Sequence, residues 1–169
     1  MHVVLVQPEI AGNTGNIIRL CANVGADLHL VEPLGYSLDS KLLKRGGLDY
    51  HELTPVTVHP NFESVQAALT GPMFSFSSKS TRRYDEVDFE QNAVLVFGTE
   101  RHGLNREVTN QVPDANRLTI PMQPDNRSLN LANAVAVVAY EAWRQQGFSG
   151  AGDVGASTSE TPGAEAFDP

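Results

Sequence analysis

Short apolar segments alternate with segments of helical periodicity along most of this chain, and this alternation is the feature that most restricts its fold. The apolar segments are four or five residues long, which is typical of strands buried on both faces of a parallel sheet. Their order predicts one α/β domain with a mostly parallel sheet flanked by helices. Strands are expected at residues 3–6, 28–31, 56–59, 73–76, 93–97 and 117–120, and helices at 14–24, 40–45, 61–69 and 131–146, with a short turn after Asn105.

The composition divides the chain into a domain and a tail. A length of 169 residues is enough for one domain with a normal core. The domain is expected at residues 1–148, and the acidic, Gly-, Ala- and Ser-rich residues 149–169 are expected to form a disordered tail. The net charge is −8, and four of the 20 acidic groups but none of the 12 basic groups follow Gly150. Bulk charge therefore gives no support for a nucleic-acid partner.

A polar cluster at residues 125–130 leads directly into the segment 131–139, in which almost every residue is apolar or small. One Ser or Asn would satisfy the exposed N–H groups at the start of this helix. The cluster contains more polar side chains than capping needs, so we expect it to contact a ligand. Its candidate residues are Arg127, Ser128, Asn130 and Asn133.

Polar residues also follow the strands expected at 3–6, 73–76 and 93–97. Because the carboxyl ends of parallel strands meet at one edge of a sheet, we expect a single site there. Gly98 and Gly103 bracket a compact loop after the third of these strands, which contains Glu100.

The first helix has a polar stripe opposite its apolar stripe. Asn16, Arg19 and Asn23 lie on this polar stripe, and a plain solvated surface is the alternative interpretation. The last helix is expected to bury both faces, one against the sheet and one against a second copy of the chain. A wholly internal helix is the alternative there.

Several classes of site are excluded by missing patterns. The chain has neither a P-loop nor a G-x-G-x-x-G, so a flavodoxin-like nucleotide binder is disfavoured. It has no G-x-S-x-G, and its five histidines lack the spacing of metal ligands. No apolar run could span a bilayer, the N-terminus has no basic signal region, and Cys21 is the single cysteine. These features favour a cytoplasmic protein without a metal or a membrane partner.

Three segments resemble the three motifs of the SPOUT superfamily of methyltransferases, namely residues 13–19, 96–104 and 120–136. More narrowly, residues 1–148 resemble the TrmL (YibK-like) family of tRNA ribose 2′-O-methyltransferases. The resemblance implies a C-terminal trefoil knot, a homodimer through the C-terminal helix, S-adenosylmethionine as methyl donor, and the anticodon region of tRNA as partner. Ribosomal RNA as substrate and an inactive knotted RNA-binding protein are the alternatives.

The resemblance also implies roles for individual residues. The donor pocket is expected to be lined by Phe76, Ser77, Gly98, Glu100, Ile120, Met122, Ser128 and Leu129. The implied catalytic or substrate-positioning residues are Asn16, Arg19, Glu100, Ser128 and Asn130, and the pair Tyr140-Glu141 also matches. The cations considered for RNA binding are Arg19, Lys41, Lys44, Arg45, Lys79, Arg82, Arg83 and Arg144.

Chemistry suggests a specific role for Arg19. Methyl transfer to a ribose hydroxyl requires a weak nucleophile to be aligned and its developing negative charge to be neutralised. A guanidinium scarcely deprotonates, so we expect Arg19 to orient a phosphate and stabilise the alkoxide rather than act as a base. One departure from the family pattern Glu-x-Arg-Gly-Leu is the order Arg101-His102, which places a histidine in the loop. His102 is a candidate for RNA contact or proton transfer, and a passive loop residue is the alternative.

Overall fold

The computed structural model describes residues 1–38 and 54–152. The helix expected at 40–45, with Lys41, Lys44 and Arg45, lies outside the described residues. Most of the expected tail, from residue 153 on, also lies outside them.

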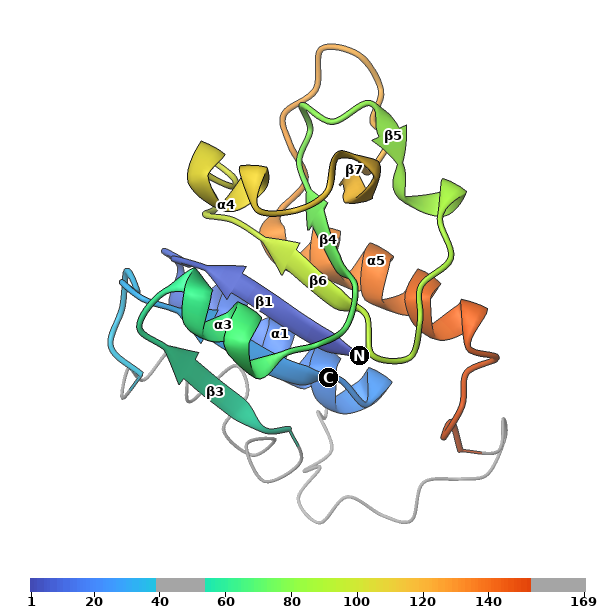
Figure 1. Ribbon diagram of the computed structural model, residues 1–169, viewed down its shortest axis with the longest axis horizontal. Coiled ribbons are helices and arrows are strands. Elements are labelled where there is room, and N and C mark those ends of the chain that lie inside the picture. The colour runs from blue at the N-terminus through green and yellow to red at the C-terminus, as the bar shows by residue number, and fades with distance from the viewer. Residues whose placement is uncertain (39–53, 153–169) are drawn as a thin grey trace, which may run out of the picture.

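The described residues form the expected alternation of strands and helices (Figure 1). All six predicted strands are confirmed, and the turn predicted after Asn105 is a short helix that the Asn105 side chain caps by accepting from Val108 N at 2.8 Å. The strands are β1 (His2–Val6), β2 (Asp27–Val31), β3 (Val56–His59), β4 (Met73–Phe76), β5 (Arg82–Arg83), β6 (Val94–Phe97) and β7 (Arg117–Thr119). The helices are α1 (Ala11–Val24), α3 (Phe62–Ala68), α4 (Arg106–Asn110) and α5 (Leu131–Gln145), with 3-10 turns η2 (Tyr84–Glu86) and η3 (Asp114–Asn116).

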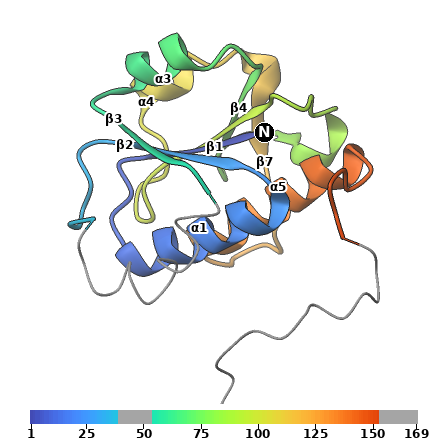
Figure 2. The ribbon, with the colours of Figure 1, turned by 90° about the horizontal axis from the view of Figure 1, so that it is seen from below.

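The strands form one sheet in the order β3-β2-β1-β6-β4-β7-β5, and the paired strands are parallel. Figure 2 shows α1 and α5 on one face of the sheet, with α3 and α4 on the other. The predicted α/β architecture is therefore confirmed. None of the described helices is long and apolar enough to cross a membrane.

Alternate residues of the central strands fill two separate cores. Val3 and Leu5 of β1 pack under α1 and α5, whereas Val4 and Val6 pack under α3 and α4. This follows from the two-residue period of a strand, which sends neighbouring side chains to opposite faces. Cys21 lies in the first core, and burial, with the Asp27 charge adding to it, raises the pKa of its thiol to about 12. The cysteine is therefore a packing residue.

Helix α5 packs on the sheet and beside α1. Its inner residues Val135, Val138 and Ala139 are fully buried, but Val137 and Tyr140 are 37% and 44% exposed. The inner face of α5 is therefore buried against the sheet as predicted, and the alternative of a wholly internal helix is wrong. Burial of the outer face against a second copy of the chain stays a prediction. The outer face leaves apolar surface in contact with solvent.

Candidate functional site

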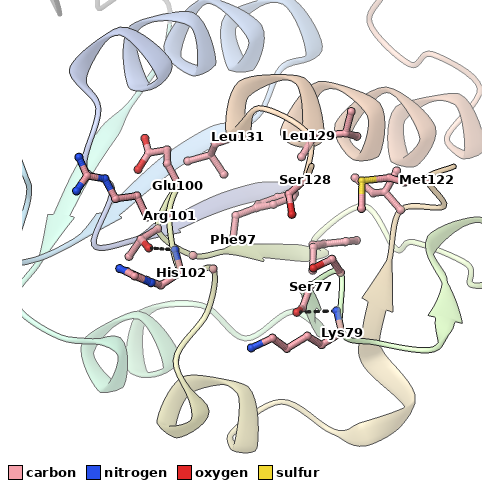
Figure 3. A pocket seen from close by; sticks show the side chains of 17 residues that line it. Ser77, Lys79, Phe97, Glu100, Arg101, His102, Met122, Ser128, Leu129 and Leu131 are labelled. Carbon is pink, nitrogen blue, oxygen red and sulfur yellow. Dashed lines mark hydrogen bonds between the residues drawn. The ribbon is translucent and has the colours of Figure 1, made fainter. Parts of the chain in front are cut away.

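A cavity of about 350 Å³ lies at the carboxyl ends of β4, β6 and β7 (Figure 3). Loops that follow these strands and the first turn of α5 supply its lining. Three of the four loops that were expected to form one site therefore meet at the cavity, whereas the loop after β1 does not line it and instead contacts Glu100. All eight residues that the resemblance assigned to the donor pocket line this cavity, namely Phe76, Ser77, Gly98, Glu100, Ile120, Met122, Ser128 and Leu129.

One part of the cavity is aromatic and apolar. The rings of Phe76 and Phe97, from the ends of neighbouring strands, stack with centroids 4.7 Å apart and planes 14° apart. Ile120 and Leu131 also line the cavity. Such walls suit a flat, uncharged ring system, because burial of apolar surface and ring contacts stabilise it without paired charges.

The loop after β6 is compact because two glycines allow it. Thr99 and Gly103 exchange backbone hydrogen bonds of 3.1 and 3.0 Å, and Gly103 has a φ of +69°. A Cβ added at Gly98 would overlap the backbone of Gly103 and Leu104. His102 N donates to Thr99 Oγ1 at 3.0 Å and closes the loop further. The loop therefore brings its backbone to the cavity wall in one fixed conformation.

Glu100 uses its carboxylate to hold the start of α1. Glu100 Oε2 accepts from Glu9 N at 2.7 Å and Oε1 accepts from Ile10 N at 3.1 Å. Ile10 occupies the N-cap position of α1 and offers no side-chain cap. The carboxylate thus supplies, from a loop 90 residues away, both the missing hydrogen-bond acceptor and a negative charge at the positive end of the helix.

Asn13, which is not among the site residues predicted from the sequence, links this carboxylate to the start of α5. Its Nδ2 donates to Glu100 Oε1 at 3.0 Å, and its Oδ1 accepts from Asn130 Nδ2 at 2.9 Å. Asn130 in turn caps α5 by accepting from Ala132 N at 2.9 Å. A signal was present in the sequence, because Asn13 lies four residues before Ile17 on the apolar stripe of α1 and is 7% exposed. A polar residue on a buried stripe needs partners.

A second contact holds the segment that leads into α1. Gly35 N donates to Pro8 O at 2.9 Å, and a Cβ at Gly35 would come within 2.7 Å of the Cα of Glu9. The Tyr36 hydroxyl lies 2.6 Å from Thr14 Oγ1 in the first turn of the helix. The position of α1 is therefore fixed from two sides.

Asn16 and Arg19 lie on the exposed face of α1, as the stripe predicted. Neither is among the residues that line the cavity, whereas Ser128 is. The structure therefore connects Glu100 and Asn130 through Asn13, places Ser128 at the cavity, and leaves Asn16 and Arg19 outside the cavity of their own chain.

Three of the predicted RNA-binding cations have partners within the chain. Arg82 donates to the carbonyls of Ala115 and Glu86. Arg83 is paired with Asp85, which raises the pKa of the guanidinium, and Arg144 is paired with Glu141. Lys79 differs, because it lies on an exposed turn at the cavity. The RNA contacts of these residues stay predictions.

Histidines form a chain across neighbouring strands, away from the cavity. His29 Nδ1 lies 3.0 Å from His59 Nε2, and His29 Nε2 lies 3.3 Å from His2 Nδ1. Burial, with the neighbouring imidazoles His2 and His59 adding to it, lowers the pKa of His29 to about 4. Because opposite nitrogens of His29 face the two neighbours, one ion could not be ligated by all three rings. Among the described residues, no group of His, Cys, Asp or Glu could hold a metal ion.

Comparison with known proteins agrees with this geometry. Residues 1–140 match the SpoU rRNA Methylase family. A tRNA (cytidine(34)-2′-O)-methyltransferase of Methylovorus glucosotrophus is 54% identical over 150 residues, which cover 88% of this chain and 97% of that protein. The enzyme of the same name from Escherichia coli (strain K12) is 47% identical over 152 residues, covering 89% and 97%.

Solved structures give the same result. A structure described as giving insight into the 2-OH methylation of C/U34 on tRNA has a TM-score of 0.82 at 44% identity, covering 87% of this chain and 96% of that chain. The SpoU methyltransferase AviRb from Streptomyces viridochromogenes, solved with AdoMet, has a TM-score of 0.79 at 25% identity, covering 89% and 59%. This chain therefore belongs to the SpoU family of RNA methyltransferases, and its fold is the knotted α/β fold of that family.

Proposed function

We propose that this protein transfers a methyl group from S-adenosylmethionine to the ribose 2′-hydroxyl of nucleotide 34 in tRNA. The observation that carries the proposal is the cavity at the carboxyl ends of the strands, where all three motif segments of the sequence meet or connect. The similarity to enzymes that are named for nucleotide 34 supports the choice of tRNA over ribosomal RNA. A tRNA substrate also favours the cytoplasm as its location.

The cavity fits the donor on the evidence of its own walls. Its volume of about 350 Å³ lies within the usual range for small-molecule sites. The stacked rings of Phe76 and Phe97 suit the adenine base, and Gly98 keeps the wall free of a side chain. The donor supplies a methyl group that is activated by bonding to a sulfonium. Ser128 and the loop after β6 would hold it.

The polar residues then have different tasks. We assign Arg19 to the substrate, where its guanidinium would bind a phosphate and neutralise the developing alkoxide. Asn16 and Ser128 would align the ribose hydroxyl through hydrogen bonds. Glu100 and Asn130 have their side chains engaged at the starts of α1 and α5, so we assign them positioning roles.

We further propose that the protein acts as a homodimer through α5. Val137 and Tyr140 leave apolar surface on its outer face, beside α1, which carries Arg19. A second copy that covers this surface would remove it from water. Val137→Asp is expected to shift the sedimentation of the protein to the monomer at micromolar concentration. A monomeric wild-type protein at that concentration would contradict the proposal.

The activity is tested with unmodified tRNA transcripts, the donor and mapping of ribose methylation. The expected result is one 2′-O-methyl group at nucleotide 34. Arg19→Ala is expected to lower the methylation rate more than tenfold. If the protein methylated ribosomal RNA fragments and not tRNA, ribosomal RNA would be its substrate class. Calorimetry that detects no donor binding would favour the RNA-binding protein without catalysis.

A further inference from the structure

The lysine and arginine side chains of the described residues fall into two groups, apart from Arg19, which has contacts of its own. One group has hydrogen-bond or ion-pair partners within the chain. It consists of Arg82, Arg83, Arg117 and Arg144. The side chains of the other group are exposed and have no hydrogen-bond or ion-pair partner within the described part of the chain. It consists of Lys79, Arg101, Arg106 and Arg127.

Two of these four unpartnered cations line the cavity, and a third is the sequence neighbour of a lining residue. Lys79 and Arg101 line it, and Arg127 directly precedes Ser128, which lines it too. Arg106, in contrast, lies on α4 and does not line the cavity. We call Lys79, Arg101 and Arg127 the basic rim. Figure 3 shows Lys79, Arg101 and His102 on one side of the cavity, with Met122 and Leu129 on the other.

Rigid turns present two members of the basic rim. Lys79 lies in a turn closed by Ser80 N, which donates to Ser77 O at 3.2 Å, and its own N–H donates to Ser77 Oγ at 3.2 Å. Arg101 lies at the tip of the loop closed by the Thr99–Gly103 bridge. The two turns follow β4 and β6, which are neighbours in the sheet. The positions of these cations are therefore set by the fold, although their side chains reach into solvent.

Acids offset the rim only in part, since Glu9 Oε2 accepts from Arg101 N at 3.4 Å. Glu100 is the one acidic residue among the described residues that line it, and its carboxylate is turned to the N–H groups of Glu9 and Ile10. The chain as a whole carries a net charge of −8. A locally positive cavity mouth on an acidic protein attracts an anion to that place and repels it from most others.

We propose that the basic rim binds the phosphodiester backbone of the RNA on either side of the nucleotide that is methylated. This inference rests on the proposed function and names the surface that places the substrate. A ribose whose 2′-hydroxyl reaches a donor held in the cavity brings its flanking phosphates to the mouth, because they are bonded to the same sugar. The paired arginines Arg82, Arg83 and Arg144 would have to break internal contacts to do the same work.

The test measures the affinity of the full-length protein for an unmodified tRNA transcript over a range of KCl concentrations, with S-adenosylhomocysteine present. Each lost phosphate contact is expected to reduce the slope of log K against log salt by about 0.7 to 1. The variant K79Q/R101Q/R127Q should therefore lose about 2 to 3 units of slope and bind more weakly at low salt. Arg106→Gln, an exposed arginine outside the cavity, is the matched control and should lose much less.

Two outcomes would contradict the proposal that the basic rim binds the RNA backbone. One is an unchanged salt slope in the triple variant, and the other is a loss in Arg106→Gln as large per charge as in the rim. The donor also carries a carboxylate, which is a second negative group that the basic rim could bind. Calorimetry with S-adenosylhomocysteine alone measures this interaction in the absence of RNA. If donor affinity fell and tRNA affinity did not, the rim would serve the donor and the RNA inference would be wrong. Wild-type protein that neither binds nor methylates tRNA would instead overturn the proposed function.

Discussion

Two polar networks of this protein are built with similar hydrogen bonds but connect different elements of the fold. Glu100, Asn13 and Asn130 join the loop after β6 to the first turn of α1 and the start of α5 at distances of 2.9 to 3.0 Å. The histidine chain joins side chains of β1, β2 and β3 at 3.0 and 3.3 Å. Glu100 lines the cavity, and none of the three histidines does. A network between loops can set the geometry of a site, whereas one within the sheet bears mainly on stability.

The largest effect on methylation is expected from Glu100→Gln. The amide can accept one of the two backbone N–H bonds, but its NH₂ group would face the other donor, so a part-buried or exposed donor at the start of α1 loses its partner at a cost of about 1 kcal/mol. The start of α1 would shift, and a displacement of about 1 Å can lower a rate by about 100-fold. Single-turnover methylation rates and urea unfolding measure the two effects. Glu107→Gln, on the exposed side of α4, is the control.

If Glu100→Gln changed neither the rate nor the stability, the loop network would not position the site, and the contrast with the histidines would fail. A lost rate with an unchanged free energy of unfolding would instead indicate a direct chemical role for Glu100. The pair of measurements therefore separates positioning from catalysis.

Asn13 should give the next largest effect. Asn13→Ala removes both links and is expected to lower the methylation rate about tenfold, which corresponds to about 1.4 kcal/mol in the barrier. Asn13→Asp should be worse, because it places a second carboxylate where the amide now lies 3.0 Å from Glu100. Asn23→Asp, exposed on the same helix, makes the same chemical change without this neighbour. Equal rates for the two Asp variants would contradict the role of Asn13.

The contrast also explains what the sequence could predict. The apolar segments predicted six strands, because a continuous apolar run is a local signal. They missed β5, whose two residues, Arg82 and Arg83, have no such signal and pair only because β7 lies beside them. The donor pocket was found by resemblance. The contact of Glu100 with the backbone of Glu9, 91 residues away, was not predictable, because a backbone N–H leaves no mark in a sequence.

The histidine chain should affect stability at acidic pH rather than methylation. The pKa of His29 is 6.5 when unperturbed and about 4 in the folded protein. Between these values the unfolded chain binds a proton that the folded chain does not, so the free energy of unfolding falls as the pH falls from 6.5 towards 4. The loss is at most about 1.4 kcal/mol per pH unit, or on the order of 3 kcal/mol in total. Urea unfolding from pH 7.5 to 4.5 measures it.

His29→Gln, which can hydrogen-bond but does not titrate, is expected to flatten this pH dependence. Its methylation rate at pH 7.5 should stay within about twofold of the wild-type rate, since His29 is already neutral there. A large loss of methylation rate at neutral pH would mean that the histidine chain also sets the geometry of the site. The distinction drawn between the two networks would then be wrong.

The smallest effect is expected from His2→Ala. His2 lies at the end of the chain of imidazoles, keeps 24% of its side chain exposed and makes the longer contact of 3.3 Å, so its removal should cost less than about 1 kcal/mol. Because His2 helps to lower the pKa of His29, its removal should raise that pKa towards 6.5 and narrow the acid range in which stability is lost. Unfolding curves at pH 7.5 and 5.0 test both points. An unchanged acid loss in His2→Ala would mean that burial alone, without coupling between the rings, controls the protonation of His29.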